Sequence, residues 1–233
     1  TAAAAWTSET GTRSETQNPT FGMESIAVHE LYALVSVSKQ DLEDSTFDLE
    51  AFLNGEMAEQ FGVSEGAAFI SGSGNGKPEG LLTSNDIGSV QSSASGKFSG
   101  DDLVNLFYEL KEAYLNNATW VLSRGTLRRV RTLKDGQGNY LWAPGLRADA
   151  RPATILDRPY ITCPDMPAVA TGAKPILFGD FRRGYLIVDR LDMEVMTDPF
   201  TSKKTGMVEF SARKRVGGQV ILGDAIKALE IMA

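Results

Sequence analysis

Residues 45–78, STFDLEAFLNGEMAEQFGVSEGAAFISGSGNGKP, contain the strongest helical pattern of the chain and its clearest break. Ser45 to Asp48 supply a cap followed by an acid, and apolar residues recur at helical spacing through position 69. The pattern predicts a helix from Thr46 to Ile70, about 25 residues or roughly 37 Å long at the usual rise per residue, which is long for a compact domain. Three glycines at positions 55, 62 and 66 each weaken such a helix by up to about 1 kcal/mol. The helix therefore needs packing against other parts of this chain or against another subunit.

The helix ends in the glycine-rich segment 71–78, where we place a domain transition and expect a flexible exit. Before the helix, alternating apolar residues from Met23 to Ser38 suit two strands or one long bent strand. After it, Ser99 to Asp102 cap a second helix that we expect to end at Asn116, and a basic helix is predicted from Thr126 to Lys134. Short strands are predicted at 120–122, 155–156, 176–179, 185–188, 193–196, 208–215 and 220–222. Because helices and strands mix without regular alternation and no repeat has a fixed period, the predicted fold class is α+β.

Composition limits the classes of function. The 233 residues include 30 acidic and 23 basic side chains, a formal charge of −7, and 42% of the chain is apolar. This predicts one large or two small soluble domains, and the acidic balance argues against general binding to a phosphate backbone. No stretch reaches the roughly 20 apolar residues that span a bilayer, and no signal peptide is predicted at the N-terminus. Residues 6–18 have little to bury and suit an extended, exposed hairpin arm.

The single cysteine and the single histidine restrict the chemistry. Cys163 cannot form an intramolecular disulfide, and we expect a small, partly buried side chain there. His29 cannot form a multi-histidine metal site, and a surface or sheet-edge position is expected. We therefore predict no metal and no cofactor.

Two motifs could indicate an enzyme. The glycine-rich segment lacks the spacing of a phosphate loop and has Pro78 where that loop carries a hydroxyl residue. Ser36 and Lys39 match S-x-x-K, and residues 204–206 match the K-T-G of serine acyl-transferases. However, charged residues follow Lys39, so the lysine would stay solvated and could not act as a base, and the S-D-N element is missing. A serine acyl-transferase using Ser36 and Lys39 remains a remote alternative to the prediction of no catalytic residues.

Charged residues form two patches of opposite sign, which suits self-assembly through heterologous contacts. A basic group occupies the predicted helix 126–134, and an acidic group surrounds the start of the long helix; the latter comprises Glu43, Asp44, Asp48, Glu50, Glu56, Glu59 and Glu65. The candidate subunit contacts are Arg13, Glu43, Asp44, Glu50, Glu56, Glu59, Arg128, Arg129, Arg131, Lys203 and Lys204.

Five stretches in a fixed order resemble the major capsid proteins of tailed bacteriophages, which have the Hong Kong 97 fold. They are residues 37–45, residues 69–74 with 78–82, residues 120–123 through 133–141, residues 178–185 and residues 213–218. The resemblance covers nearly the whole chain. It implies an extended loop, a peripheral domain built on a long spine helix, and an axial domain that meets its copies around five-fold and quasi-six-fold axes. It also implies that the glycine-rich exit lets the axial domain pivot.

On this resemblance, residues 1–20 are part of the extended loop, 21–76 and 190–217 form the peripheral domain, and 77–189 and 218–233 form the axial domain. The implied function is that of a structural subunit of an icosahedral shell, in a phage, prophage or gene-transfer particle, that self-assembles into pentamers and hexamers and encloses DNA without sequence-specific binding. Portal, scaffold and decoration proteins are further implied partners, assembly is expected in the bacterial cytoplasm, and no membrane is involved. The nearest alternative is an encapsulin-like cellular compartment.

One departure from the family concerns covalent cross-linking. Some members join subunits through an isopeptide bond between a lysine of the extended loop and an asparagine of a peripheral loop. Residues 1–20 contain Arg13 but no lysine, and residues 199–206 contain no asparagine. We therefore expect a shell held by noncovalent contacts. A second departure is the sequence Asp157-Arg158-Pro159, which stands where the family pattern suggests a glycine-proline turn.

Overall fold

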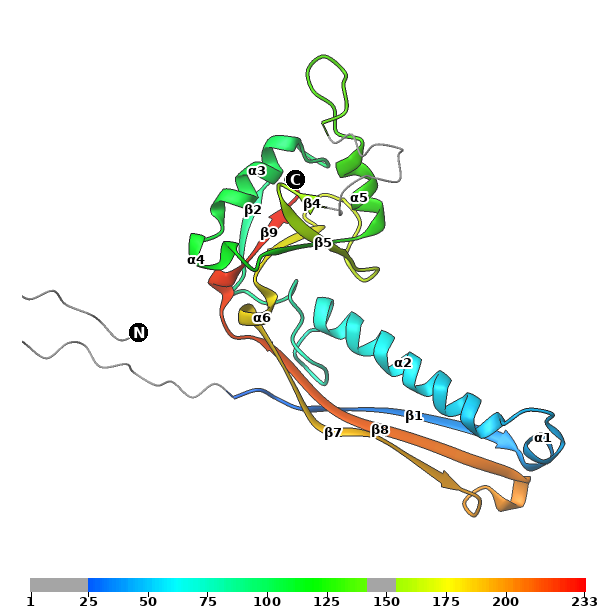
Figure 1. Cartoon of the computed structure of the whole chain (residues 1–233). Coiled ribbons are helices and arrows are strands. Elements are labelled where there is room, and N and C mark those ends of the chain that lie inside the picture. Colours follow the sequence, from blue (N-terminus) through cyan, green and yellow to red (C-terminus); the bar gives the residue numbers. More distant parts are fainter. Residues whose placement is uncertain (1–24, 142–153) are drawn as a thin grey trace, which may run out of the picture.

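The computed structural model describes residues 25–141 and 154–233, which form two units joined by continuous strands (Figure 1). One is an elongated three-stranded unit with a long helix, and the other is a six-stranded unit with shorter helices. The predicted α+β class is confirmed. The predicted extended loop, residues 1–20, lies outside the described residues.

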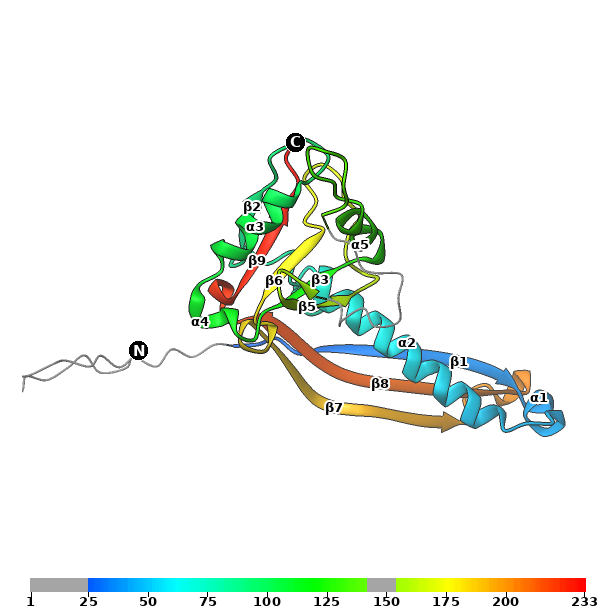
Figure 2. The ribbon, with the colours of Figure 1, turned by 45° about the horizontal axis from the view of Figure 1, so that its top comes forward.

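The three-stranded unit is an antiparallel sheet covered on one face by a helix. Its strands are β1 (His29–Ser38), β8 (Met207–Val220) and β7 (Tyr185–Asp198), in the order β1-β8-β7. Alternate residues of β1 face the helix, because successive side chains of a strand point to opposite faces. Figure 2 shows the long helix lying lengthwise over this sheet. Of the two alternatives for the region 23–38, the described residues form one strand rather than two.

The long helix α2 (Leu49–Ser71) confirms the helix predicted from the sequence, with a start three residues later. Asp48 caps it, since its carboxylate accepts a hydrogen bond from the Ala51 amide at 2.9 Å. Met57 and Phe61 are the buried side chains of α2 that pack against this sheet. Burying side chains of this size stabilises a fold by about 1.5–3 kcal/mol each.

The glycine-rich exit from α2 is tied down rather than free. The Gly80 amide donates to the Gly72 carbonyl at 2.9 Å, and the Glu79 amide donates to the Gly218 carbonyl at 3.0 Å. A Cβ atom at Gly72 would lie 2.1 Å from the Pro78 carbonyl oxygen. Close approach of backbone segments thus requires glycine at position 72, whereas we expected the segment to act as a flexible exit.

The six-stranded unit has a mixed sheet in the order β2-β9-β6-β3-β5-β4. Its strands are β2 (Gly88–Gln91), β3 (Thr119–Leu122), β4 (Thr154–Ile155), β5 (Arg158–Thr162), β6 (Ile176–Gly179) and β9 (Ile226–Glu230). Its helices are α3 (Gly100–Glu109), α4 (Glu112–Leu115), α5 (Arg124–Arg131) and α6 (Phe181–Gly184). Trp120 is fully buried at the centre, stacks on Phe178 at 4.1 Å and donates its indole N–H to the Ile155 carbonyl at 2.9 Å.

Several predicted elements have different limits. The strands expected at 185–188 and 193–196 are one strand, β7, which bulges at 189–194. The strand expected at 208–215 lies within β8, whereas of the one expected at 220–222 only Val220 belongs to a strand, the end of β8. The helix expected to reach Asn116 ends at Glu109 because Leu110 is extended, and α4 follows. The predicted domain limits at 189/190 and 217/218 fall inside β7 and β8.

The turn between β4 and β5 is the place where the sequence departs from the glycine-proline turn of the family. Leu156 and Asp157 adopt left-handed φ angles of 47° and 60° there without a glycine.

Candidate subunit-contact surfaces

The possible acyl-transferase pair does not form a catalytic site. Ser36 lies on edge strand β1 opposite Glu209 and is exposed, not at the start of a buried helix. The Lys39 side chain is 70% exposed and lies 3.6 Å from Glu43. An exposed, ion-paired lysine lacks the buried setting that a serine–lysine acyl-transfer pair requires. The K-T-G residues 204–206 lie in an exposed turn.

His29 and Cys163 have structural positions. His29 lies on edge strand β1 and pairs with Val216 of β8. Cys163 is half-buried against the core. Within residues 25–141 and 154–233, no group of three or more His, Cys, Asp or Glu residues could hold a metal ion. None of the helices in these ranges is both long and apolar enough to cross a membrane.

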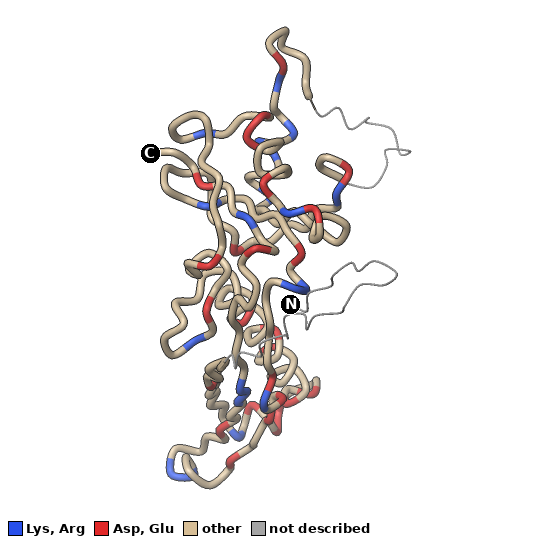
Figure 3. The backbone as a smooth tube through the Cα atoms, turned by 90° about the vertical axis from the view of Figure 1, so that its left-hand side faces the viewer, with Lys and Arg blue, Asp and Glu red and all other residues tan. Residues whose placement is uncertain are grey.

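The far end of the three-stranded unit, which we call the distal tip, gathers charges of both signs. It consists of helix α1 (Lys39–Asp44), residues 45–52, and the loop 199–206 between β7 and β8. The Lys39 amide donates to the Gly206 carbonyl at 2.9 Å, which holds α1 beside this loop. Figure 3 shows acidic and basic residues close together at this lower end of the molecule. Of the predicted contacts, Glu43, Asp44, Glu50, Lys203 and Lys204 lie here, and all five are exposed.

The predicted basic helix is α5, on the six-stranded unit and far from the distal tip (Figure 1). Leu127 and Val130 face the core, while Arg128 and Arg129 are exposed. The Arg131 guanidinium donates to the Tyr160 hydroxyl at 3.0 Å. The acidic group around the start of α2 lies on the other unit. A contact between this group and α5 therefore requires two copies of the chain.

One member of the predicted acidic group is used inside the subunit. Glu65 on α2 lies 2.8 Å from Lys214 on β8, and Asp189 on β7 lies 3.5 Å from the same ammonium. Burial lowers the pKa of Lys214, but the hydrogen bond and charge of Glu65, with those of Asp189, outweigh it and leave this pKa above the ordinary lysine value. Glu65 therefore links α2 to the sheet, and the interpretation of Glu65 as part of a surface patch was wrong. Glu56 and Glu59 do remain exposed on α2.

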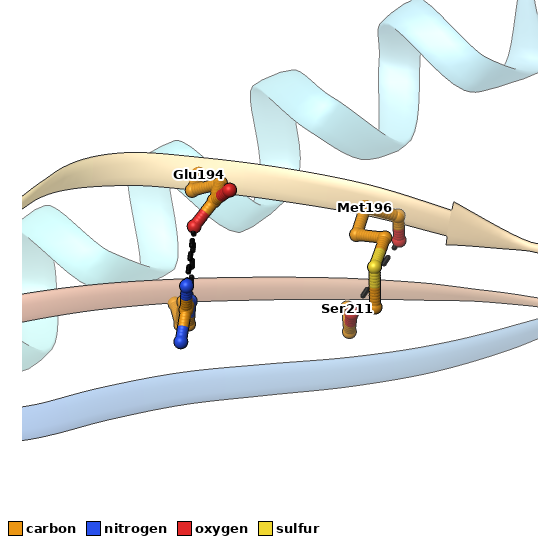
Figure 4. A network of polar contacts seen from close by, with 4 residues as sticks. Glu194, Met196 and Ser211 are labelled. Atoms are coloured by element: carbon orange, nitrogen blue, oxygen red, sulfur yellow. Dashed lines mark hydrogen bonds and ion pairs between the residues drawn. The ribbon is translucent and has the colours of Figure 1, made fainter.

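Sequence reasoning missed an apolar surface on the face of the three-stranded sheet opposite α2, which none of the described helices covers. Tyr32, Leu34 and Met196 are exposed there and line a hollow of about 480 Å³. Figure 4 shows the polar contacts beside it, in which Arg213 donates to Glu194 at 2.7 Å and the Ser211 hydroxyl donates to the Met196 carbonyl at 3.4 Å. The sequence of residues 29–38 could have indicated this surface, because some of the alternate positions that face away from α2, such as Tyr32 and Leu34, are apolar. Arg13, the remaining predicted contact, lies outside the described residues.

Comparison with known families gives a match over nearly the whole chain. The model of the phage capsid family matches residues 1–231. The comparison with curated protein sequences gave no match.

Solved structures give the same picture. A capsid chain of a native GTA particle is 40% identical, with a TM-score of 0.88, over 100% of this chain and 82% of that chain. The chain from an empty GTA particle is also 40% identical, with a TM-score of 0.85 and the same coverage. A chain of Microbacterium phage Oxtober96 is 18% identical, with a TM-score of 0.74 over 99% of this chain and 83% of its own.

An encapsulin is a more distant neighbour. The SrpI encapsulin of Synechococcus elongatus PCC 7942 is 15% identical, with a TM-score of 0.63 over 87% of this chain and 73% of its own. At this identity the likeness extends to the fold alone.

Proposed function

Because this chain belongs to the phage capsid family, it is a capsid subunit of a phage or gene transfer agent particle, and we propose that its copies form pentamers and hexamers of a closed shell that encloses DNA. The observation that carries this proposal is the 40% identity to the native GTA capsid over the full length of the chain. It favours a particle of this type over an encapsulin compartment, whose likeness is 15%. The subunit is a structural protein, not an enzyme.

The two units suggest a division of labour in the shell. In this proposal the three-stranded unit with α2 is the peripheral domain, residues 21–76 and 190–217. The six-stranded unit is the axial domain, residues 77–189 and 218–233, and residues 1–20 belong to the extended loop. Each unit has a hydrophobic cluster of its own, which supports the division, and a third cluster joins Ile70 at the end of α2 to the six-stranded unit at their boundary. The bulges of β7 near the proposed limit at residue 190 also support it.

Charge complementarity supports the proposed subunit contacts. Exposed acids on α1 and α2 (Glu43, Asp44, Glu50, Glu56 and Glu59) face basic groups of neighbouring copies, namely Arg128, Arg129, Arg131, Lys203 and Lys204, and Arg13 adds a contact from the extended loop. Each exposed pair contributes at most about 1 kcal/mol, but a shell repeats every contact many times.

Other partners follow from the same proposal. The shell forms in the bacterial cytoplasm, joins a portal and scaffold or decoration proteins, and holds DNA without reading its sequence. The formal charge of −7 supports enclosure without tight binding, because an acidic surface repels the phosphate backbone.

Electron microscopy of the purified protein tests the proposal. Closed shells, rings or pentamers are expected, and nuclease treatment of particles isolated from the producing cells should leave a protected DNA fraction. Shells that protect a protein cargo and no DNA would favour the encapsulin-like alternative. A monomer labelled by an acylating probe, with no labelling of Ser36→Ala, would replace the capsid proposal by an acyl-transferase.

A further inference from the structure

Three phenylalanine side chains are exposed at the distal tip. Phe47 and Phe52 are 58% and 52% exposed and pack edge to face with ring centroids 6.0 Å apart, beside α1 and at the start of α2. Phe200 is 78% exposed in the loop between β7 and β8. Such aromatic groups are more often buried or used as interface anchors than left in water.

The charged residues beside these aromatic side chains form an acidic group and a basic group. Asp41 and Asp44 are exposed near Phe47, and Lys203 and Lys204 are exposed near Phe200. Within the described residues, none of these four takes part in an ion pair, whereas neighbouring Glu43 is engaged by Lys39. The tip thus has an acidic half and a basic half, each with an exposed aromatic group, and the two halves do not neutralise each other within one copy.

We propose that the distal tip is a two-sided docking surface, in which the basic half of one copy, Phe200 with Lys203 and Lys204, docks on the acidic half of the next copy, Phe47 and Phe52 with Asp41 and Asp44. The proposal rests on the proposed function, since a shell supplies the neighbouring copy. The two halves differ, so the contact is heterologous, and repeating it around an axis closes a ring of copies.

The loop that carries Phe200 is preorganised for this contact. The amides of Phe200 and Thr201 donate to the Asp198 carboxylate at 2.7 and 3.2 Å. Gly206, with a φ of 70°, ends the turn at residues 203–205 and is fixed by the hydrogen bond from Lys39. A loop already held in shape loses little freedom on docking, which lowers the entropic cost of the contact.

A second copy is the occupant because both halves of a complementary contact are present on one chain. Opposite charges bring the halves together and set their register, and burial of the three rings supplies the apolar part. An exposed aromatic patch without such an occupant would favour uncontrolled association.

Disulfide trapping tests the geometry. Two variants, Phe200→Cys and Phe52→Cys, are co-expressed in a Cys163→Ser background, which has no other cysteine. Oxidised particles should give dimers on a non-reducing gel, and reduction should remove them. The matched control pairs Phe52→Cys with Tyr108→Cys, which is 79% exposed on α3 of the other unit, and should give no dimer. Intact particles without the 52–200 dimer would overturn the proposal.

Charge reversal tests the partner assignment. Lys203→Glu with Lys204→Glu, and separately Asp41→Lys with Asp44→Lys, should each lower particle yield at least about tenfold while the subunit still unfolds cooperatively. Combining the four changes restores opposite charges across the contact and should recover most of the yield. Normal yield from either double variant, or no recovery in the combination, would overturn the pairing. A wild-type chain that never forms particles would instead contradict the proposed function.

Discussion

Lys214 links three elements of the subunit through one ammonium group. Its side chain is 20% exposed and that of Glu65 is 14% exposed, so water screens this pair less than the other ion pairs of the described residues. Asp189 contributes from the bulged part of β7. Lys214, Glu65 and Asp189, which we call the Lys214 cluster, therefore join α2 to the three-stranded sheet at the place where β7 bulges.

Removing the lysine should destabilise the subunit. In Lys214→Met, Glu65 loses its partner in a largely buried place, and we expect a loss of about 1–3 kcal/mol in the free energy of unfolding. Denaturant unfolding of the unassembled subunit measures it. Lys111→Met is the matched control, because the Lys111–Asp224 pair is exposed, and no measurable loss is expected. Equal stability of wild type and Lys214→Met would show that the cluster contributes nothing.

The Lys214 cluster also predicts a pH dependence. The pKa of Lys214 is raised in the folded state, so its contribution is complete below the ordinary lysine pKa of about 10.4 and is lost as the pH rises through the higher folded value. The stability difference between wild type and Lys214→Met should therefore be constant near neutrality and shrink in strong alkali. Unfolding curves of both proteins at several alkaline pH values measure the difference. A gap that closes between about pH 7 and pH 9, below the ordinary lysine pKa, would mean that another group is responsible.

At the scale of the element, α2 has glycines with different roles. A Cβ atom at Gly55 or Gly62 would meet no atom within 4 Å. Gly55→Ala and Gly62→Ala should therefore each stabilise the unassembled subunit by about 0.5–1 kcal/mol, because alanine loses less backbone freedom on forming a helix. Thermal and denaturant unfolding of the two variants measure this gain. Lower stability in both would imply that α2 is not continuous through these positions.

The glycine at the end of α2 should behave oppositely. A Cβ atom at Gly72 would lie 2.1 Å from the Pro78 carbonyl oxygen and 2.4 Å from that of Ala68, and neither backbone atom can move freely. Gly72→Ala should destabilise the subunit by at least about 1–3 kcal/mol. The same unfolding measurements apply, and a neutral effect would show that the exit from α2 is looser than its hydrogen bonds indicate.

At the scale of the whole molecule, the N-terminal residues should matter for assembly and not for the fold. Residues 7–18 have little apolar surface to bury, so deleting them should leave the melting temperature of the subunit within a few degrees and abolish particles. Calorimetry and electron microscopy of the same preparation measure both effects. A large drop in melting temperature would place these residues in the core of the subunit.

The particle should also come apart into single chains in hot detergent. Residues 1–20 offer no lysine and residues 199–206 no asparagine, so the known type of isopeptide bond lacks both partners in these stretches. One cysteine per chain can join subunits only in pairs, and reducing agent breaks that bond. A ladder of reduction-resistant oligomers on a denaturing gel would show a covalent bond formed elsewhere.

Local patterns were sufficient to predict the elements whose causes are local. The caps and apolar spacing of residues 45–71 predicted α2, and the Ser99–Asp102 cap predicted the start of α3. The basic face of α5 and the buried strand β6 were likewise evident, because periodicity, capping and charge are properties of neighbouring residues. The order of five family-like stretches predicted the capsid fold.

Only the tertiary structure decided which distant segments meet. Strand β9 lies between β2 and β6, and Glu65 pairs with Lys214 across 149 positions of sequence. The distal tip exists because β1 pairs with β8 and so brings α1 beside the loop 199–206. Such contacts depend on how whole sheets and helices pack against one another. This packing is determined by the burial of apolar faces together with the register of the paired strands. No local window of sequence contains both partners of these contacts, so the sequence determined the elements and the tertiary structure determined the surfaces they share.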